Sequence, residues 1–108
     1  MSRSNYRRGY AFEVRVRKYL ESLGFYVIRS AGSHGVADLI AFKRGQNMKP
    51  LMIQCKTDGH ISIEERRDLW AVAQECNCDA LVASKDIHRQ LKLAIMENPI
   101  DLGTMKVT

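Results

Sequence analysis

The spacing of apolar residues changes along the chain and predicts where its helices and strands lie. Near the N-terminus apolar side chains recur every three or four residues, as on an amphipathic helix that stops at Gly24. Ser62 and Glu65 match a capping box that starts a second helix, and Asp86 is placed to cap a third. The predicted elements are a helix over about 4–23, strands over 25–29, 36–43 and 51–56, a helix over 63–76, a strand over 79–84, a helix over 86–97 and a short edge strand over 104–107.

The order α-β-β-β-α-β-α, up to residue 97, predicts an α/β fold in which a mixed β-sheet is flanked by helices. A chain of 108 residues has the size of one domain, so residues 1–108 are expected to form a single unit. The polar segment 44–50 predicts a hairpin between two strands. The continuously apolar run 80–83 predicts a central strand.

The composition indicates a soluble globular protein, with 45% hydrophobic and 27% charged residues. No apolar run approaches the roughly 20 residues that a membrane span needs, and the arginine-rich N-terminus lacks the apolar segment of a secretory signal. We therefore expect no membrane partner and a cytoplasmic location, with nucleoid association as an alternative, and the host cytoplasm for a viral protein. Three cysteines argue against a disulfide framework.

The net charge of +5 and the isoelectric point near 9.3 favour a polyanionic partner, with nucleic acid the first candidate. The alternative for any one of these cations is a solvated surface charge. Many of them lie in residues 3–18, where Glu13 is the one acid; the basic residues there are Arg3, Arg7, Arg8, Arg15, Arg17 and Lys18.

Two adjacent predicted strands carry the residues with the clearest chemistry. Asp38 opens an apolar strand segment, although aspartate is disfavoured in strands. On the next strand Gln54 and Lys56 share one face, and Cys55 points to the other, towards packing. Each has an ordinary alternative: Asp38 as a strand-start cap, Gln54 and Lys56 as a solvated face.

Together these residues suit a divalent metal and a water molecule that attacks a phosphodiester. Glu13 and Asp38 would supply charge to Mg²⁺, Gln54 an amide oxygen and Cys55 its backbone carbonyl. Mn²⁺ is expected to substitute. Lys56 would orient or deprotonate the water and offset developing negative charge. The alternative for Glu13 is a surface salt bridge to Arg17 at i+4.

Four motifs in this order resemble the archaeal-type Holliday-junction resolvases of the PD-(D/E)xK nuclease superfamily. The motifs are Arg8-Gly9-x-x-Phe12-Glu13, Gly24-Phe25-x-Val27-x-Arg29-Ser30-Ala31-Gly32-Ser33, Ala37-Asp38-Leu39-Ile40-Ala41 and Gln54-Cys55-Lys56. The resemblance covers roughly the first 85 residues. The resemblance implies a restriction-endonuclease-like fold and a homodimeric, magnesium-dependent endonuclease that cuts four-way DNA junctions.

By position the resemblance makes Glu13, Asp38, Gln54 and Lys56 the active site. It places Arg8, Arg29, Ser30 and Ser33 near DNA or the active site. Arg7 adds a phosphate-binding candidate. His34 is a candidate for contact with the scissile phosphate or for proton transfer, with an exposed loop histidine as its alternative.

Two positions depart from the family pattern. Gln54 stands where the family normally has an acid, and Ala37 where the superfamily name has proline. The glutamine removes one negative charge, which leaves the number of metal ions open. Two other functions follow: another nuclease of the superfamily, restriction-like or repair, or a module that grips branched DNA without cutting. Magnesium-dependent nicking and the choice among DNA substrates discriminate these functions.

Overall fold

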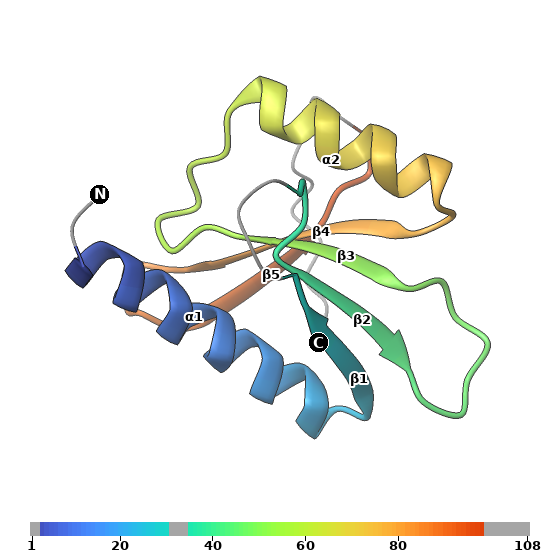
Figure 1. The fold of residues 1–108 in the computed structure, drawn as a ribbon, viewed down its shortest axis with the longest axis horizontal. Helices are drawn as coiled ribbons and strands as arrows, with labels where there is room; N and C mark the ends of the chain where they lie inside the picture. Colours follow the sequence, from blue (N-terminus) through green and yellow to red (C-terminus); the bar gives the residue numbers. More distant parts are fainter. Residues whose placement is uncertain (1–2, 31–34, 99–108) are drawn as a thin grey trace.

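The structure is a computed structural model that describes residues 3–30 and 35–98. Seven elements follow one another in these ranges (Figure 1). They are α1 (Arg3–Ser22), β1 (Phe25–Arg29), β2 (Leu39–Lys43), β3 (Leu51–Cys55), α2 (Ile63–Glu75), β4 (Asp79–Lys85) and β5 (Leu91–Ile95).

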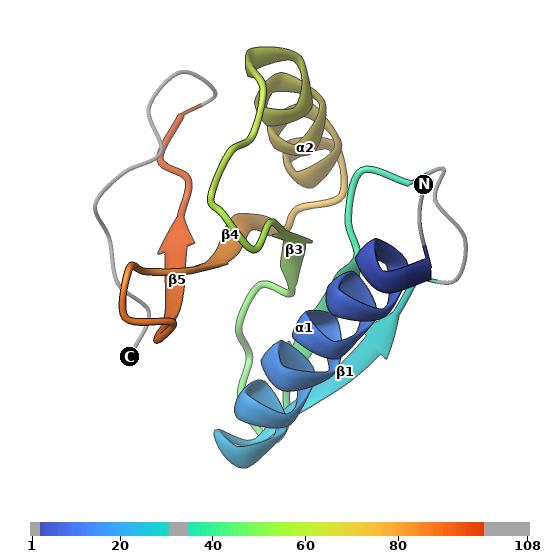
Figure 2. The same ribbon diagram turned by 90° about the vertical axis from the view of Figure 1, so that its left-hand side faces the viewer.

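The strands form one mixed sheet in the order β1-β2-β3-β4-β5. Neighbouring strands are antiparallel except β3 and β4, which run parallel because α2 makes the crossover between them. Figure 2 shows β1 and β5 at opposite sides of the molecule. The predicted hairpin over 44–50 is confirmed, and β4 lies inside the sheet, as its apolar run predicts.

The two helices cover opposite faces of the sheet. Alternate residues of a strand point to opposite faces, and the buried residues fall into two clusters accordingly. In β3, Leu51 and Ile53 pack with α1, whereas Met52 packs with α2. The buried helix residues on the two sides are Phe12, Val16 and Leu20 of α1 and Leu69 and Ala73 of α2.

The predicted α/β fold with a mixed, helix-flanked sheet is confirmed. The capping box is also present: Ser62 caps α2, and its side chain and that of Glu65 each accept a hydrogen bond from the other's backbone. Gly24, with φ of 93°, follows the end of α1 in a conformation that glycine adopts readily. No helix in residues 3–30 and 35–98 is long and apolar enough to cross a membrane.

The predicted third helix over 86–97 is wrong, because this segment forms a turn and β5. Asp86 caps the turn: its Oδ1 accepts hydrogen bonds from the backbone N–H groups of His88 at 2.8 Å and Gln90 at 2.9 Å. Every second residue of β5 then points to the α1 face of the sheet, namely Leu91, Leu93 and Ile95. The edge strand predicted over 104–107 lies outside the described residues.

Candidate active site

Asp38 ties three strands together where β2 begins. Its backbone N–H donates to the Ile53 carbonyl at 2.7 Å, and its carbonyl accepts from the Ser30 N–H at 2.9 Å. Its side-chain Oδ2 accepts from the backbone N–H of Cys55 at 2.7 Å. The strand predicted over 36–43 begins at Leu39.

Glu13 reaches the same region from α1. The Arg29 guanidinium Nε donates to Glu13 Oε1 at 2.9 Å and also lies over the Tyr10 ring, 4.7 Å from its centroid. Burial raises the pKa of the Glu13 carboxyl, the charge of Asp38 adds to the rise, and the bond from Arg29 opposes it. The ion-pair partner of Glu13 among the described residues is thus Arg29. The Nε of Arg17, the alternative partner, is buried and has no hydrogen-bond partner among the described residues.

Cys55 shows that the two carboxylates share one neighbourhood. Burial raises the pKa of its thiol well above the ordinary value, and the charges of Asp38 and Glu13 raise it further. The thiol packs against the core on the α1 side, as the strand alternation predicts. Cys55 therefore offers its backbone, rather than a reactive thiolate, to the candidate site.

Gln54 lies in β3, and Lys56 follows directly after Cys55, the last residue of that strand. The β2–β3 register ends with Leu39 opposite Ile53, and Asp38 meets the residues on either side of Gln54, through the Ile53 carbonyl and the Cys55 N–H. The ammonium Nζ of Lys56 lies 2.7 Å from Oε2 of Glu65, at the start of α2. The structure thus brings Glu13, Asp38 and the Gln54–Cys55 segment together. It pairs Lys56 with Glu65, which the sequence predicted only as part of a helix cap.

The candidate DNA-binding residues are described to different extents. Arg29 is held by Glu13 and Tyr10, and the backbone of Ser30 is bonded to Asp38. Arg7 and Arg8 lie on α1, with their backbone alone described. Ser33 and His34 lie outside the described residues.

We use the word fork for the place where Asp38 meets the end of β3. The oxygen atoms at this fork suit a hard divalent cation only if neutral oxygens complete the set. Within residues 3–30 and 35–98 no group of three or more His, Cys, Asp or Glu side chains is arranged to hold a metal ion. Glu13 and Asp38 supply two carboxylates close enough to influence each other. An amide oxygen at Gln54 and the backbone carbonyl of Cys55, both acceptable to Mg²⁺, would be the further donors.

Within residues 3–30 and 35–98, a mixed five-stranded sheet with a helix on each face agrees with the α/β class predicted from the sequence. The family model of archaeal Holliday junction resolvases (Hjc) matches residues 4–103. The chain therefore belongs to the archaeal Holliday junction resolvase family.

Two relatives extend this finding. Over 55 residues the chain is 51% identical to the crossover junction endodeoxyribonuclease Hjc of Methanocaldococcus jannaschii. This match covers 51% of this chain and 38% of that protein. The solved structure of Archaeoglobus fulgidus Hjc, a Holliday junction resolvase from an archaeal hyperthermophile, matches with a TM-score of 0.65 and 26% identity. That match covers 80% of this chain and 70% of the other.

Proposed function

We propose that this protein is a DNA endonuclease that resolves four-way junctions by paired phosphodiester hydrolysis. The observation that carries the proposal is the fork at Asp38: its carboxylate is fixed by the Cys55 N–H beside Glu13, in a chain that belongs to the resolvase family. A fixed carboxylate costs little reorganisation when it engages a charged group, which favours a catalytic use of this geometry.

In this proposal Glu13 and Asp38 hold Mg²⁺, or Mn²⁺ in its place, with the Gln54 amide and the Cys55 carbonyl as neutral donors. The bound ion would polarise the phosphate and lower the pKa of the attacking water. Lys56 presents an ammonium group that offsets the negative charge developing on the phosphate. Arg29 contacts Glu13 and Tyr10 at the site and is our candidate for contact with a DNA phosphate there.

We also propose a homodimer, because resolving a junction takes two incisions and two symmetric copies supply two sites. Light scattering of the purified protein measures the mass directly. A monomer that makes paired cuts would contradict this part of the proposal.

The proposal is tested with a labelled four-way junction, incubated with and without Mg²⁺, and with linear duplex, flap and single-stranded DNA as comparison substrates. We expect symmetric nicks in the junction that require the metal, and little cutting of the other substrates. Equal cutting of linear duplex or flap DNA would indicate a different nuclease of the same fold.

Asp38→Asn is expected to abolish cleavage while junction binding stays near that of the parent. The substitution removes a metal ligand and leaves the phosphate-binding cations in place. Gel-shift titration and single-turnover cleavage on the same junction measure the two properties separately. Near-normal nicking by this variant in Mg²⁺ would remove Asp38 from the active site.

A second candidate function is a module that grips branched DNA without cutting. The amide at Gln54 favours it, since it leaves the fork with two carboxylates. Tight, junction-selective binding without any cleavage in Mg²⁺ or Mn²⁺ would select this function over the endonuclease.

A further inference from the structure

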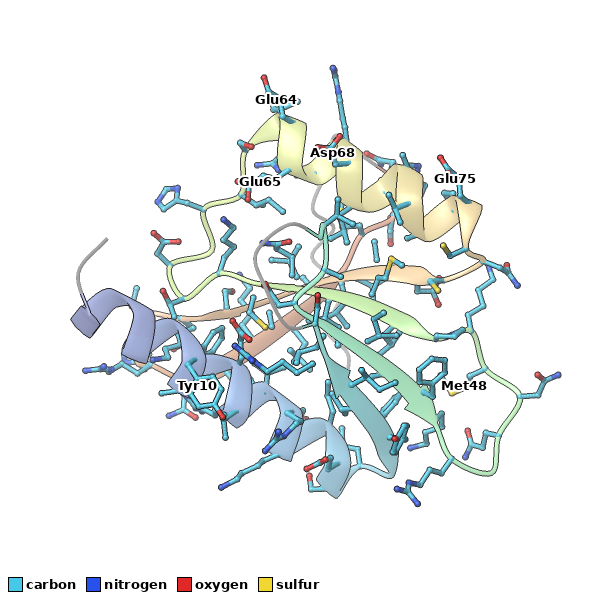
Figure 3. The ribbon with its side chains drawn as sticks, in the orientation of Figure 1. Tyr10, Met48, Glu64, Glu65, Asp68 and Glu75 are labelled. Atoms are coloured by element: carbon cyan, nitrogen blue, oxygen red, sulfur yellow. The ribbon has the colours of Figure 1, made fainter. Side chains whose placement is uncertain are left out.

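Glu65 takes part in two interactions at once, the capping box of α2 and an ion pair with Lys56. Its Oε1 accepts a hydrogen bond from the backbone N–H of Ser62 at 3.2 Å, and its own N–H donates to Ser62 Oγ at 3.1 Å. Its other oxygen, Oε2, lies 2.7 Å from Lys56 Nζ. Figure 3 shows Glu65 on the side of α2 that faces the sheet, whereas Glu64 projects away from it. One carboxylate therefore connects the start of α2 to Lys56.

The backbone at both ends of this connection is anchored. The N–H of Lys56 donates to the Ala83 carbonyl of β4 at 2.8 Å. On the other side, Ile61 is buried beneath α2, and its carbonyl accepts from Arg66 Nε at 3.2 Å. A lysine side chain has four rotatable bonds and keeps many conformations unless something holds its end. The Glu65 carboxylate, itself fixed by the capping box, can hold the end of the Lys56 side chain in this way.

We propose that Glu65 is a positioning residue for Lys56, whose ammonium group it holds in one direction at the end of β3. The inference rests on the proposed role of Lys56 in cleavage. It also bears on Gln54, which lies two residues before Lys56 and carries no charge. Glu65 is the carboxylate that the structure sets against Lys56, and it comes from a helix rather than from β3.

The electrostatics of Glu65 agree with this role. The hydrogen bond from Lys56 is the main cause that holds the pKa of the Glu65 carboxyl below its usual range, and the Ser62 N–H contributes in the same direction. The side chains of Lys56 and Glu65 are 28% and 41% exposed, so water screens the pair. We therefore expect its loss to appear in the rate of cleavage more than in the stability of the fold.

Three variants separate the two uses of Glu65. Glu65→Gln keeps an oxygen for the capping box and removes the charge beside Lys56. Glu65→Ala removes both. Ser62→Ala, the matched control, weakens the cap and leaves the ion pair with Lys56 intact. All three are compared with the parent by thermal unfolding, junction binding and single-turnover cleavage in Mg²⁺.

We expect Ser62→Ala to lower the Tm by about 4–8 °C and to change the cleavage rate by less than about twofold. Glu65→Gln should unfold near the parent temperature yet lose about tenfold in rate, with unchanged affinity for the junction. If Glu65→Gln cleaves at the parent rate, or if Ser62→Ala loses as much rate as Glu65→Ala, Glu65 is only a helix cap.

A double-mutant cycle tests whether Glu65 acts through Lys56. In a Lys56→Ala background, Glu65→Gln should cause no further loss of rate, because the group it positions is already gone. Losses that multiply in the double variant would overturn the proposal.

A measurement without catalysis distinguishes this inference from the proposed function. In protein with isotope-labelled lysine, the signal that disappears in Lys56→Ala identifies the Lys56 side chain by NMR. Glu65→Gln should shift that signal, and Ser62→Ala should not. A protein that cuts no junction while showing this shift would disprove the endonuclease and leave the ion pair intact. A protein that cuts through Lys56 but shows no shift would disprove the role of Glu65.

Discussion

Residue 54 of this chain is an amide, Gln54, which limits the negative charge available to a metal. Glu13 and Asp38 bring two negative charges, enough to balance one divalent ion. A third carboxylate would better suit two ions, since each added anion offsets their mutual repulsion. We therefore expect the DNA-free protein to bind one Mg²⁺ or Mn²⁺ ion per protomer, weakly, with any second ion entering alongside the DNA phosphate.

Gln54→Glu should tighten metal binding and lower the Mg²⁺ concentration needed for half-maximal cleavage. Manganese titration by calorimetry measures the affinity and the number of sites in parent and variant. Gln74→Glu, an exposed position on α2, makes the same change in net charge away from the fork and serves as the control. Two tight sites in the DNA-free parent, or equal gains in both variants, would disprove this account of Gln54.

The candidate site was only partly predictable from the amino-acid sequence. The closeness of Asp38 to the Gln54–Cys55 segment follows from pairing two neighbouring strands, which a hydrophobic pattern indicates. The ion pairs of Glu13 with Arg29 and of Lys56 with Glu65 depend on where each helix packs against the sheet. Spacing along the chain carries no information about such contacts, so Glu65 was identified only as a cap.

At the scale of elements, the segment after β4 shows how one residue can fit two structures. An aspartate accepts hydrogen bonds from backbone N–H groups two residues ahead both at a helix start and in a turn. Here the turn forms, with Arg89 at φ of 62°, and the apolar residues that follow alternate in steps of two, as on a strand. The period-2 spacing of Leu91, Leu93 and Ile95 was the signal that favoured β5.

The Asp86 turn gives a pH prediction for the β4–β5 hairpin. The hydrogen bonds from the N–H groups of Gln90 and His88 hold the pKa of the Asp86 carboxyl below its usual 3.8. The contribution of this group to stability is therefore fully present above about pH 3.8 and is lost as the pH falls through the lower native value.

Asp86→Asn keeps an acceptor for the turn but does not titrate. On acidification from about pH 6 to pH 2, the Tm of the parent should fall toward that of the Asn variant. Asp86→Ala should be less stable than the parent near neutral pH. Thermal unfolding at a series of pH values measures all three proteins. Parallel curves for parent and Asn variant would show that Asp86 adds no pH-dependent stability.

At the scale of the whole molecule, the net charge of +5 is unevenly spread, and α1 carries a large share of the cations around Glu13. A helix with this charge, packed beside the fork that bears Asp38, suits a DNA backbone that passes over the candidate site. Binding of such a protein releases counterions from DNA, so its affinity falls as salt rises. The family membership and the site chemistry thus agree with the charge distribution in favouring DNA as the partner.

Junction binding should therefore weaken steeply with salt, and Arg7 and Arg8 should account for part of the dependence. Each neutralised phosphate contributes a log–log slope near −0.9 on duplex DNA, so Arg7→Ala with Arg8→Ala should reduce the slope by up to about two. The control replaces Arg67 and Lys92, both exposed and outside α1, by alanine and loses the same net charge. Affinities over a salt series, measured with the uncut junction in the absence of metal, give the slopes. If both double variants change the slope equally, general charge rather than contact by α1 governs binding; if neither changes it, these arginines do not touch the DNA backbone.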